Sequence, residues 1–379
     1  MRTHRSDHRH PHRPSRARSI TRGGRWAAVL GAVVASATIA ACSASSGSGS
    51  SSSGSSAAGA SGAGGVASAS NAASTKPAKV QVTGSGGQTL RVGDQAGTGA
   101  QALLTAAGLL NKLPFKVSWA DFTSGPPMLE AMSAGDLDIG GVGDAPPVFA
   151  AAGGAKIAVV GALANNPNSA ALVVPKGSSI TSIAQLKGKK IAVAQGSSAD
   201  YHLLTVLEKA GLSVHDVTLE YLQPAQALAA LSSGAVDAWD VWSPFVEQAV
   251  HQDGARILVN GQGFGSNFSY AVASKSAISD PAKAKEITEY LQLLDRAHRW
   301  ADAHTTAWAA VWAKATGLPQ TVMQAAAHDD TQHPIAVGAS TVTAEQSLVA
   351  AFAKAGLIPN SYSFSNYAST GFNSALGGS

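Results

Sequence analysis

The chain has 379 residues, of which 45% are hydrophobic and only 6% are aromatic. This length predicts two lobes, and an apolar content dominated by alanine favours an α/β protein over a β-sandwich or a barrel. The formal charge of +4 comes from residues 1–41, which hold eight arginines and one acid, Asp7. Subtracting them from 27 basic and 23 acidic residues leaves 19 and 22. The remainder is slightly acidic, which excludes a basic nucleic-acid-binding surface.

The first 41 residues have the pattern of a secretory signal peptide. An Arg- and His-rich segment precedes the uncharged apolar run 26–41, which is followed by Cys42. Sixteen apolar residues are fewer than the roughly 20 that a membrane-spanning helix needs. Ile39-Ala-Ala-Cys42 resembles a bacterial lipobox, in which the cysteine is lipidated, so we expect a lipoprotein signal over 1–41 and lipidation at Cys42. The alternative is an ordinary signal peptide with an incidental cysteine.

The segment after the signal peptide predicts a tether. Residues 43–74 are mainly Ser, Gly and Ala, and this composition cannot bury enough apolar area to fold. Residues 42–79 are therefore expected to link the lipidated cysteine to a folded part that begins near Val80. Cys42 is also the sole cysteine, so no disulfide can form within the chain.

From residue 88 onward, strand and helix patterns alternate. Continuous or alternating apolar runs predict strands, while proline-initiated segments and apolar residues at a 3.6-residue period predict helices. Repeated β-α units of this length favour mainly parallel sheets. The expected strands are 88–93, 115–120, 137–140, 156–164, 190–194, 217–222 and 237–242. The expected helices are 99–112, 125–134, one after Pro147, 180–188, 198–211, 224–233, one from Pro244, 281–304, one around Trp308–Ala315, and 344–355.

Three segments have the composition of a ligand site: Gly141-Val-Gly-Asp144, Gln195-Gly-Ser-Ser198 and Asp237-Ala-Trp-Asp-Val-Trp242. The first two lie between a strand and a helix start, where open α/β sheets place their ligand crevice. Helix N-termini offer unpaired N–H groups that suit an anion. Lys and Arg are absent between Lys116 and Lys156, so such an anion would depend on amides and hydroxyls. The same glycines and serines could also serve only as helix caps.

Motifs for catalysis or for metal binding are weak or missing. Gly261-Gln-Gly-Phe-Gly265 lacks the spacing of a dinucleotide loop, and the chain has no G-x-S-x-G, H-E-x-x-H or CxxC sequence. His202 lies near Ser198 and Asp200, but residues two apart on a helix do not face each other. We therefore expect His202 on the helix surface or lining a cleft. No cofactor and no metal site are expected.

Several ordered motifs together resemble the importer solute-binding proteins for aliphatic sulfonates, a branch that also includes taurine and nitrate binders. They are the segment from Trp119 to Pro147, then Gln195-Gly-Ser-Ser198, Tyr221-Leu-Gln-Pro224 and Val236-Asp-Ala-Trp239. The resemblance implies an α/β protein with the type II periplasmic-binding fold, in which two lobes joined by two crossovers close on a ligand in the interlobe cleft. The crossovers are expected near Val174–Lys176 and Gly263–Ser269. Lobe one would then be 88–174 plus 270–379, and lobe two 175–269.

The resemblance also implies the site residues. The expected ligand-binding residues are Gln95, Gly143, Asp144, Gly196, Ser197, Ser198, Trp239, Asp240 and Trp242. The chain differs from its relatives where Asp94 replaces an aromatic residue and where Trp242-Ser243-Pro244 replaces Trp-Asp-Pro. A stabilising effect of taurine alone would indicate that Asp240 is the partner of an ammonium group on the ligand.

The function that follows is that of a binding protein and not of an enzyme. We expect an extracytoplasmic subunit of an ABC importer, anchored to the cell membrane by lipid alone, that binds a small organic anion and docks as a monomer on permease subunits. Aliphatic sulfonates are the first expectation, and taurine, nitrate and sulfate esters remain alternatives. A ligand sensor and a desulfinase-like enzyme are the alternatives from other classes. A desulfinase is known on this fold, and its chemistry resembles a mechanism in which a cysteine is the nucleophile. The sole cysteine of this chain lies in the lipobox and is not expected to serve that role.

Overall fold

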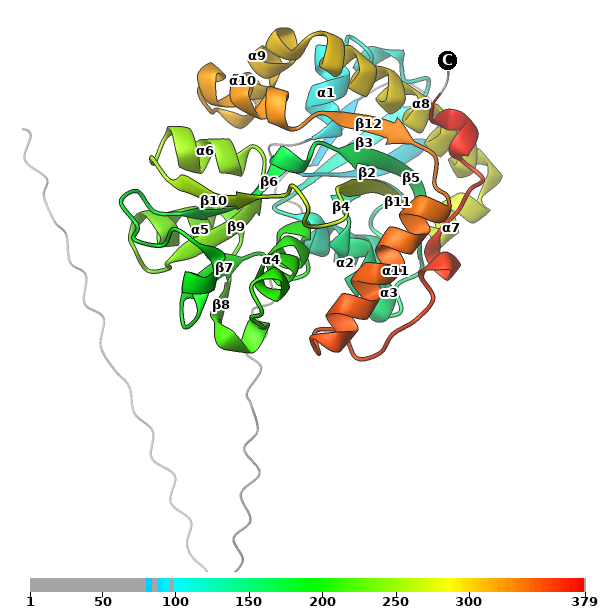
Figure 1. Ribbon diagram of the computed structural model, residues 1–379. Helices are drawn as coiled ribbons and strands as arrows, with labels where there is room; N and C mark the ends of the chain where they lie inside the picture. Colours follow the sequence, from blue (N-terminus) through cyan, green and yellow to red (C-terminus); the bar gives the residue numbers. More distant parts are fainter. Residues whose placement is uncertain (1–79, 84–87, 96–98, 378–379) are drawn as a thin grey trace, which may run out of the picture. The chain divides into compact units, whose positions relative to one another are not determined.

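The computed structural model describes residues 80–83, 88–95 and 99–377 (Figure 1). The expected signal peptide, Cys42 and tether lie outside these residues. Within them, no helix is long and apolar enough to cross a membrane.

Two sheets carry the described part of the chain, in agreement with the predicted α/β class. The seven-stranded sheet has the order β1-β3-β2-β4-β11-β5-β12, and the five-stranded sheet has the order β10-β6-β9-β7-β8. The strands of the first sheet are β1 (Val80–Thr83), β2 (Thr89–Gln95), β3 (Lys116–Phe122), β4 (Ile139–Gly143), β5 (Ile157–Asn165), β11 (Phe268–Ser274) and β12 (Gln332–Ile335). The strands of the second sheet are β6 (Ala170–Val174), β7 (Lys190–Val193), β8 (Thr218–Tyr221), β9 (Ala238–Trp242) and β10 (Arg256–Asn260).

Helices pack on both faces of the seven-stranded sheet (Figure 1). One apolar core joins this sheet to α1, α8, α9 and α10, and the other joins it to α2, α3 and α11. These helices are α1 (Ala100–Ala106), α2 (Gly125–Ser133), α3 (Ala145–Ala152), α8 (Pro281–Ala303), α9 (Thr305–Thr316), α10 (Gln320–Asp329) and α11 (Ala339–Lys354), with α7 (Lys275–Ser279) preceding α8. Many of the buried helical residues are alanines, as the composition predicted.

Two smaller cores cover the five-stranded sheet. One includes buried residues of α5 (Pro224–Ser232) and α6 (Phe245–His251), and the other includes α4 (Ser198–Lys209). Side chains of β9 alternate between them, because successive residues of a strand point to opposite faces. Trp239 and Val241 enter the first core, and Ala238 enters the second.

The prediction of mainly parallel sheets is wrong. Parallel pairing is confined to β2 with β3 and β4, and to β7 with β8 and β9, whereas the other six strand pairs of the described chain are antiparallel. The cause is the path of the chain between the sheets. β11 returns from the second sheet and inserts between β4 and β5, antiparallel to both.

The first crossover also lies earlier than predicted. Ala170–Val174 had been assigned to lobe one, but this strand pairs with β9 and β10 in the five-stranded sheet. The chain therefore passes between the sheets near Pro167–Ser169, before β6, and returns between β10 and β11. A continuous apolar strand gives no sign of which sheet it will join, and this explains the error.

Two predicted helices are shorter than expected. The helix expected over 99–112 ends at Ala106, and Gly108 then adopts φ +65°, a left-handed conformation that stops the helix, before a 3₁₀ turn at Leu110–Lys112. The helix expected over 180–188 is a 3₁₀ turn at Ile183–Leu186, started by a Ser182–Gln185 capping box. Neither change alters the order of the elements.

Candidate functional site

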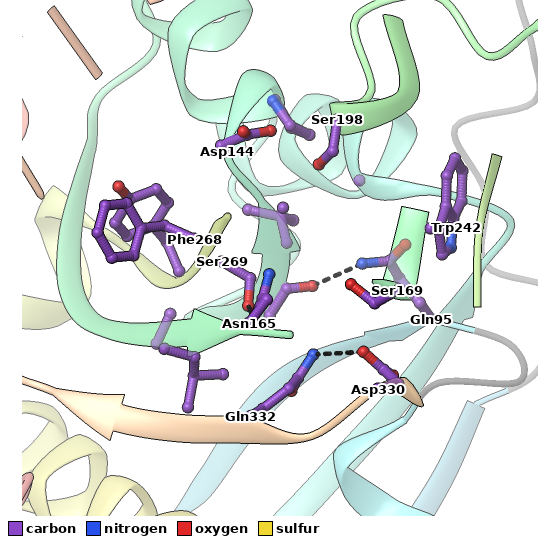
Figure 2. Close-up of a pocket in the computed structure, with 18 of the residues that line it drawn as sticks. Gln95, Asp144, Asn165, Ser169, Ser198, Trp242, Phe268, Ser269, Asp330 and Gln332 are labelled. Carbon is purple, nitrogen blue, oxygen red and sulfur yellow. Dashed lines mark hydrogen bonds between the residues drawn. The ribbon is translucent and has the colours of Figure 1, made fainter. Parts of the chain in front are cut away.

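A cavity of about 200 Å³ lies at the carboxyl ends of β2, β4 and β9 and is lined by residues of both sheets (Figure 2). Its wall also includes the start of α4, the segment 261–267 that returns the chain to the first sheet, part of β11, and side chains of α8. Parallel strands flanked by helices leave such a crevice beyond their carboxyl ends.

Six of the nine expected site residues line this cavity: Gln95, Gly143, Asp144, Ser197, Ser198 and Trp242. Gly196, Trp239 and Asp240 are not among the lining residues. The structure therefore brings most of the expected residues together around one cavity.

Two of the three exceptions have simple structural reasons. Gly196 makes the turn that leads into α4, with φ +70°, and its amide donates to Asp200 at 2.9 Å. Trp239 is 1% exposed and belongs to the core between the second sheet and α5 and α6. Trp242, at the end of the same strand, is only partly buried and reaches the cavity.

The third exception, Asp240, is part of a buried ion pair with His202. Asp240 is fully buried, and His202 Nδ1 lies 2.9 Å from each of its carboxylate oxygens. Asp240 therefore does not face the cavity in this structure, and its contact with a ligand stays a prediction. His202, in contrast, lines the cavity from α4, one turn after Ser198.

The bonding of His202 indicates the charged imidazolium. Nδ1 faces the Asp240 carboxylate, and Nε2 lies 3.2 Å from the carbonyl oxygen of Asn260, which can only accept a hydrogen bond. Both ring nitrogens donate only when the ring is protonated. Burial by itself lowers the pKa of His202, but the charge and the hydrogen bond of Asp240 outweigh it, so the pKa is raised.

The starts of α3 and α4, one from each sheet, meet at one end of the cavity, here called the proximal end. Asp144 caps α3 and Ser197 caps α4. The Ser266 hydroxyl donates to Asp144 Oδ2 at 2.5 Å. A Cβ atom on Gly143 would lie 1.8 Å from Ser198 Oγ, so a side chain at this position would displace the Ser198 hydroxyl.

Only one of the two helix starts offers free amides. At α3 the Ala145 amide donates to Asp144, and the next two residues are prolines without an N–H group. The expectation that both helix starts could bind an anion is therefore wrong for α3. At α4 the first amides, those of Ser198 and Ala199, have no acceptor within the helix and can bind an anion, whereas the Ser198 hydroxyl beside them is hydrogen-bonded to Asp144 and joins only by turning to the anion.

Carboxyl groups line the cavity, whereas Lys and Arg are absent among its lining residues in the described chain. The Asp94 carboxylate accepts hydrogen bonds from the backbone amides of Gln95, Ala100 and Gln101, and burial raises the pKa of Asp94 to about 6. Burial likewise raises the pKa of Asp144, against the opposing effect of its hydrogen bonds with Ser266 and Ser198. Both groups bond to helix starts and serve the fold.

Sequence reasoning missed much of the remaining wall. Asn165 and Ser269 share a hydrogen bond of 2.9 Å, and both line the cavity. The segment around Gly261-Gln-Gly-Phe-Gly265, considered only as a dinucleotide loop, forms part of the wall. Gly261 lies against Pro167 of the other crossover, where a Cβ atom would be 2.4 Å from a carbonyl oxygen. The close spacing of glycines in the segment Gly261–Gly265 is a sequence signal that could have identified this part of the cavity wall.

The wall also contains three polar residues that no predicted motif included, His298, Asp330 and Gln332. They lie at the end of the cavity opposite Asp144 and Ser198, here called the distal end, where Figure 2 labels Asp330 and Gln332. They belong to α8, the junction between α10 and β12, and β12.

The sequence matches the NMT1-like family over residues 87–317. The chain belongs to this family. One relative, an aliphatic sulfonates-binding protein of Escherichia coli (strain K12) by name, is 40% identical over 190 residues, which cover 50% of this chain and 60% of that protein. The chain thus spans less than two thirds of the length of this sequence relative. The predicted resemblance to sulfonate-binding proteins is confirmed.

A solved structure matches a larger share of this chain than the sequence relative does. The alkanesulfonate-binding protein SsuA of Xanthomonas axonopodis pv. citri, bound to MOPS, superposes with a TM-score of 0.70 and 31% identity over 75% of this chain and 99% of that one. The expected periplasmic-binding fold is therefore confirmed. The desulfurization enzyme DSZB, at 18% identity and a TM-score of 0.55, shares the fold alone.

Proposed function

We propose that this family member is the solute-binding subunit of an importer and that it captures organic sulfonates in the cavity between its two sheets. The observation that carries the proposal is the proximal end, where free amides of α4 and the Ser198 hydroxyl converge without lysine or arginine. A sulfonate spreads one charge over three acceptor oxygens, which suits several neutral donors better than a single cation. The fold shared with an alkanesulfonate-binding protein supports the same ligand class.

Thermal denaturation with a ligand panel tests this proposal. A ligand at about 100 times its dissociation constant stabilises the native state by roughly 2.7 kcal/mol, which raises the melting temperature measurably. We expect a rise with sulfonates, and a smaller one or none with nitrate and sulfate esters. If no sulfonate at millimolar concentration changed the melting temperature, the proposal would be abandoned.

Binding is proposed to occur without chemical change. No predicted motif provides a nucleophile, and the sole cysteine is Cys42 of the lipobox-like segment. Sulfonates incubated with the purified protein should be recovered intact by mass spectrometry. Release of sulfite by the protein alone would assign it an enzymatic activity.

The location and the partners are part of the same proposal. Residues 1–41 act as an export signal, lipidated Cys42 anchors the protein outside the cell membrane, and the parts built on the two sheets act as lobes that close on the ligand and dock on permease subunits. The basis is the lipobox-like Ile39-Ala-Ala-Cys42. Cys42→Ser should abolish labelling by a lipid precursor and release the protein from the membrane fraction, and unchanged labelling would refute the anchor.

A further inference from the structure

The distal end of the cavity has groups that the proximal end does not use. Figure 2 shows Asp330 and Gln332 on the side of the cavity opposite Asp144 and Ser198. His298 joins them in lining this end. A ligand whose sulfonate occupies the proximal end would therefore direct its other end toward these side chains.

Asp330 has spare hydrogen-bonding capacity. In the described chain its side chain accepts one hydrogen bond, from Gln332 Nε2 over a long 3.4 Å, although a carboxylate can accept about four. Asp94 and Asp144, the other carboxyl groups of the cavity wall, each accept at least two shorter hydrogen bonds from helix starts or serine. Asp330 is therefore the wall carboxyl that remains available for a ligand.

The surroundings of Asp330 favour a positively charged partner. Burial and the neighbouring Glu247 raise the pKa of Asp330, and a cation would relieve this cost of ionisation. Burial lowers the pKa of His298 to about 4, so His298 is neutral at physiological pH and supplies no charge. With no Lys or Arg in the described wall, a cation at this end would have to come from the ligand.

Aromatic side chains lie beside the same groups. Asp330, Gln332 and His298 also line an adjoining cavity of about 30 Å³, whose wall includes Trp308 and Trp312. The two indole rings stack with centroids 4.9 Å apart. A carboxylate beside aromatic rings is a combination that binds ammonium groups.

We propose that the distal end binds a protonated amine through Asp330, and that the preferred ligands are sulfonates with a basic group at the far end of the chain. This inference rests on the proposed function, because it takes the sulfonate to be at the proximal end. Such a ligand is a zwitterion, so its cation offsets the carboxyl groups of the wall while its anion meets the amides of α4. Simple alkanesulfonates satisfy only the proximal end.

Isothermal titration calorimetry with matched ligand pairs tests the inference. Each ω-aminoalkanesulfonate of two to six carbons is compared with the alkanesulfonate that has a methyl group in place of the ammonium. At the length that spans the cavity, we expect the amine to bind about 10-fold more tightly, the effect of one charge-assisted contact. Asp330→Asn should abolish this preference, so that the amine and the methyl ligand of each length bind the variant with affinities within about 2-fold of each other.

Asp329→Asn is the matched control. Asp329 is the preceding carboxylate, pairs with His328 at 2.9 Å, and does not line the cavity. The substitution removes the same charge one residue away, so it should leave the amine preference in place. A loss of preference in both variants would mean that general charge, and not contact with Asp330, is responsible, and would overturn the inference.

The pH dependence gives a readout that a structural role of Asp330 would not produce. An ammonium binds the ionised carboxylate, so the ratio of the affinities for the amine and for the matched alkanesulfonate should increase as the pH rises through the pKa of Asp330. Titration of Asp94, Asp144 and His202 acts on both ligands and cancels in this ratio. Asp330→Asn should remove the difference. Equal affinities for amine and methyl ligands at every length would overturn the inference and leave the proposed function intact, whereas failure of all sulfonates to bind would refute the proposed function itself.

Discussion

The two ends of the cavity differ in how completely their polar groups are bonded. At the proximal end Asp144 accepts hydrogen bonds from the Ala145 amide and the Ser266 hydroxyl, and His202, one turn after Ser198 on α4, forms an ion pair with Asp240. At the distal end Asp330 has a single long hydrogen bond. A hydrogen-bond network whose donors and acceptors are all paired holds its side chains in place, whereas a side chain with unused hydrogen-bonding capacity can bind a group of the ligand. The proximal end is therefore suited to hold a constant part of the ligand, and the distal end to distinguish between ligands.

The largest difference between the two ends is expected when one partner of the buried His202–Asp240 ion pair is removed. Asp240→Ala leaves a buried imidazolium without its counter-charge, so we expect a loss of about 3–5 kcal/mol in the free energy of unfolding, measured by urea denaturation. Asp330→Asn at the distal end is the comparison and should cost less than about 1 kcal/mol. Similar losses in the two variants would contradict the contrast.

The same ion pair predicts a dependence of stability on pH. The pKa of His202 is raised above its ordinary 6.5 by Asp240, so the folded state binds the proton more tightly than the unfolded state. The resulting stabilisation is complete below the unfolded pKa of about 6.5 and is lost as the pH rises through the folded pKa. We expect the free energy of unfolding to fall over this range in the wild type and to fall less in His202→Gln. Parallel profiles for both would argue against an imidazolium.

A methyl group added at Gly143 should have the next largest effect, a loss of ligand affinity. Its Cβ would lie 1.8 Å from Ser198 Oγ, so Gly143→Ala should displace the Ser198 hydroxyl from its place at the proximal end, at a cost of about 1–3 kcal/mol in ligand binding, or roughly 5- to 150-fold in affinity. Gly141→Ala, on the same strand with no atom within 4 Å of its Cβ, is the control. Calorimetry with an alkanesulfonate measures both, and unchanged affinity in Gly143→Ala would show that the close contact is unimportant.

Removing one donor at the proximal end should have a moderate effect. Ser198→Ala deletes a hydroxyl that is hydrogen-bonded to the buried Asp144, so sulfonate binding should weaken by about 1–2 kcal/mol and the melting temperature of the free protein should fall slightly. The loss should be equal for amine-bearing and simple sulfonates, because both share the proximal end. A loss confined to one class would contradict this division of roles.

The smallest effect is expected at the distal end in the absence of ligand. Gln332 is only partly buried and donates a single long hydrogen bond to Asp330. Gln332→Ala should therefore change the free energy of unfolding by less than about 0.5 kcal/mol. A larger loss would mean that the distal groups support the fold as the proximal groups do.

Much of the fold was predictable because its signals are local. Prolines at the starts of α2, α5 and α8 and the apolar period of α4 placed these helices within a few residues of their observed bounds. Strand pairing was not predictable in the same way. The apolar run of β6 fits either sheet, and the insertion of β11 between β4 and β5 depends on packing between residues more than a hundred positions apart.

For the site, the sequence by itself determined the residues at β-α junctions. Gly143 and Asp144 follow β4 at the carboxyl edge of the first sheet, where Gln95 ends the neighbouring β2, and Ser197 and Ser198 follow β7 at the corresponding edge of the second sheet. Only the tertiary structure decided that Trp239 and Asp240 face inward, that His202 pairs with Asp240, and that Asp330 reaches the far wall. The reason is physical: a junction is fixed by a few successive residues, whereas the face on which a buried strand residue lies and the contacts between distant helices depend on how the whole chain packs.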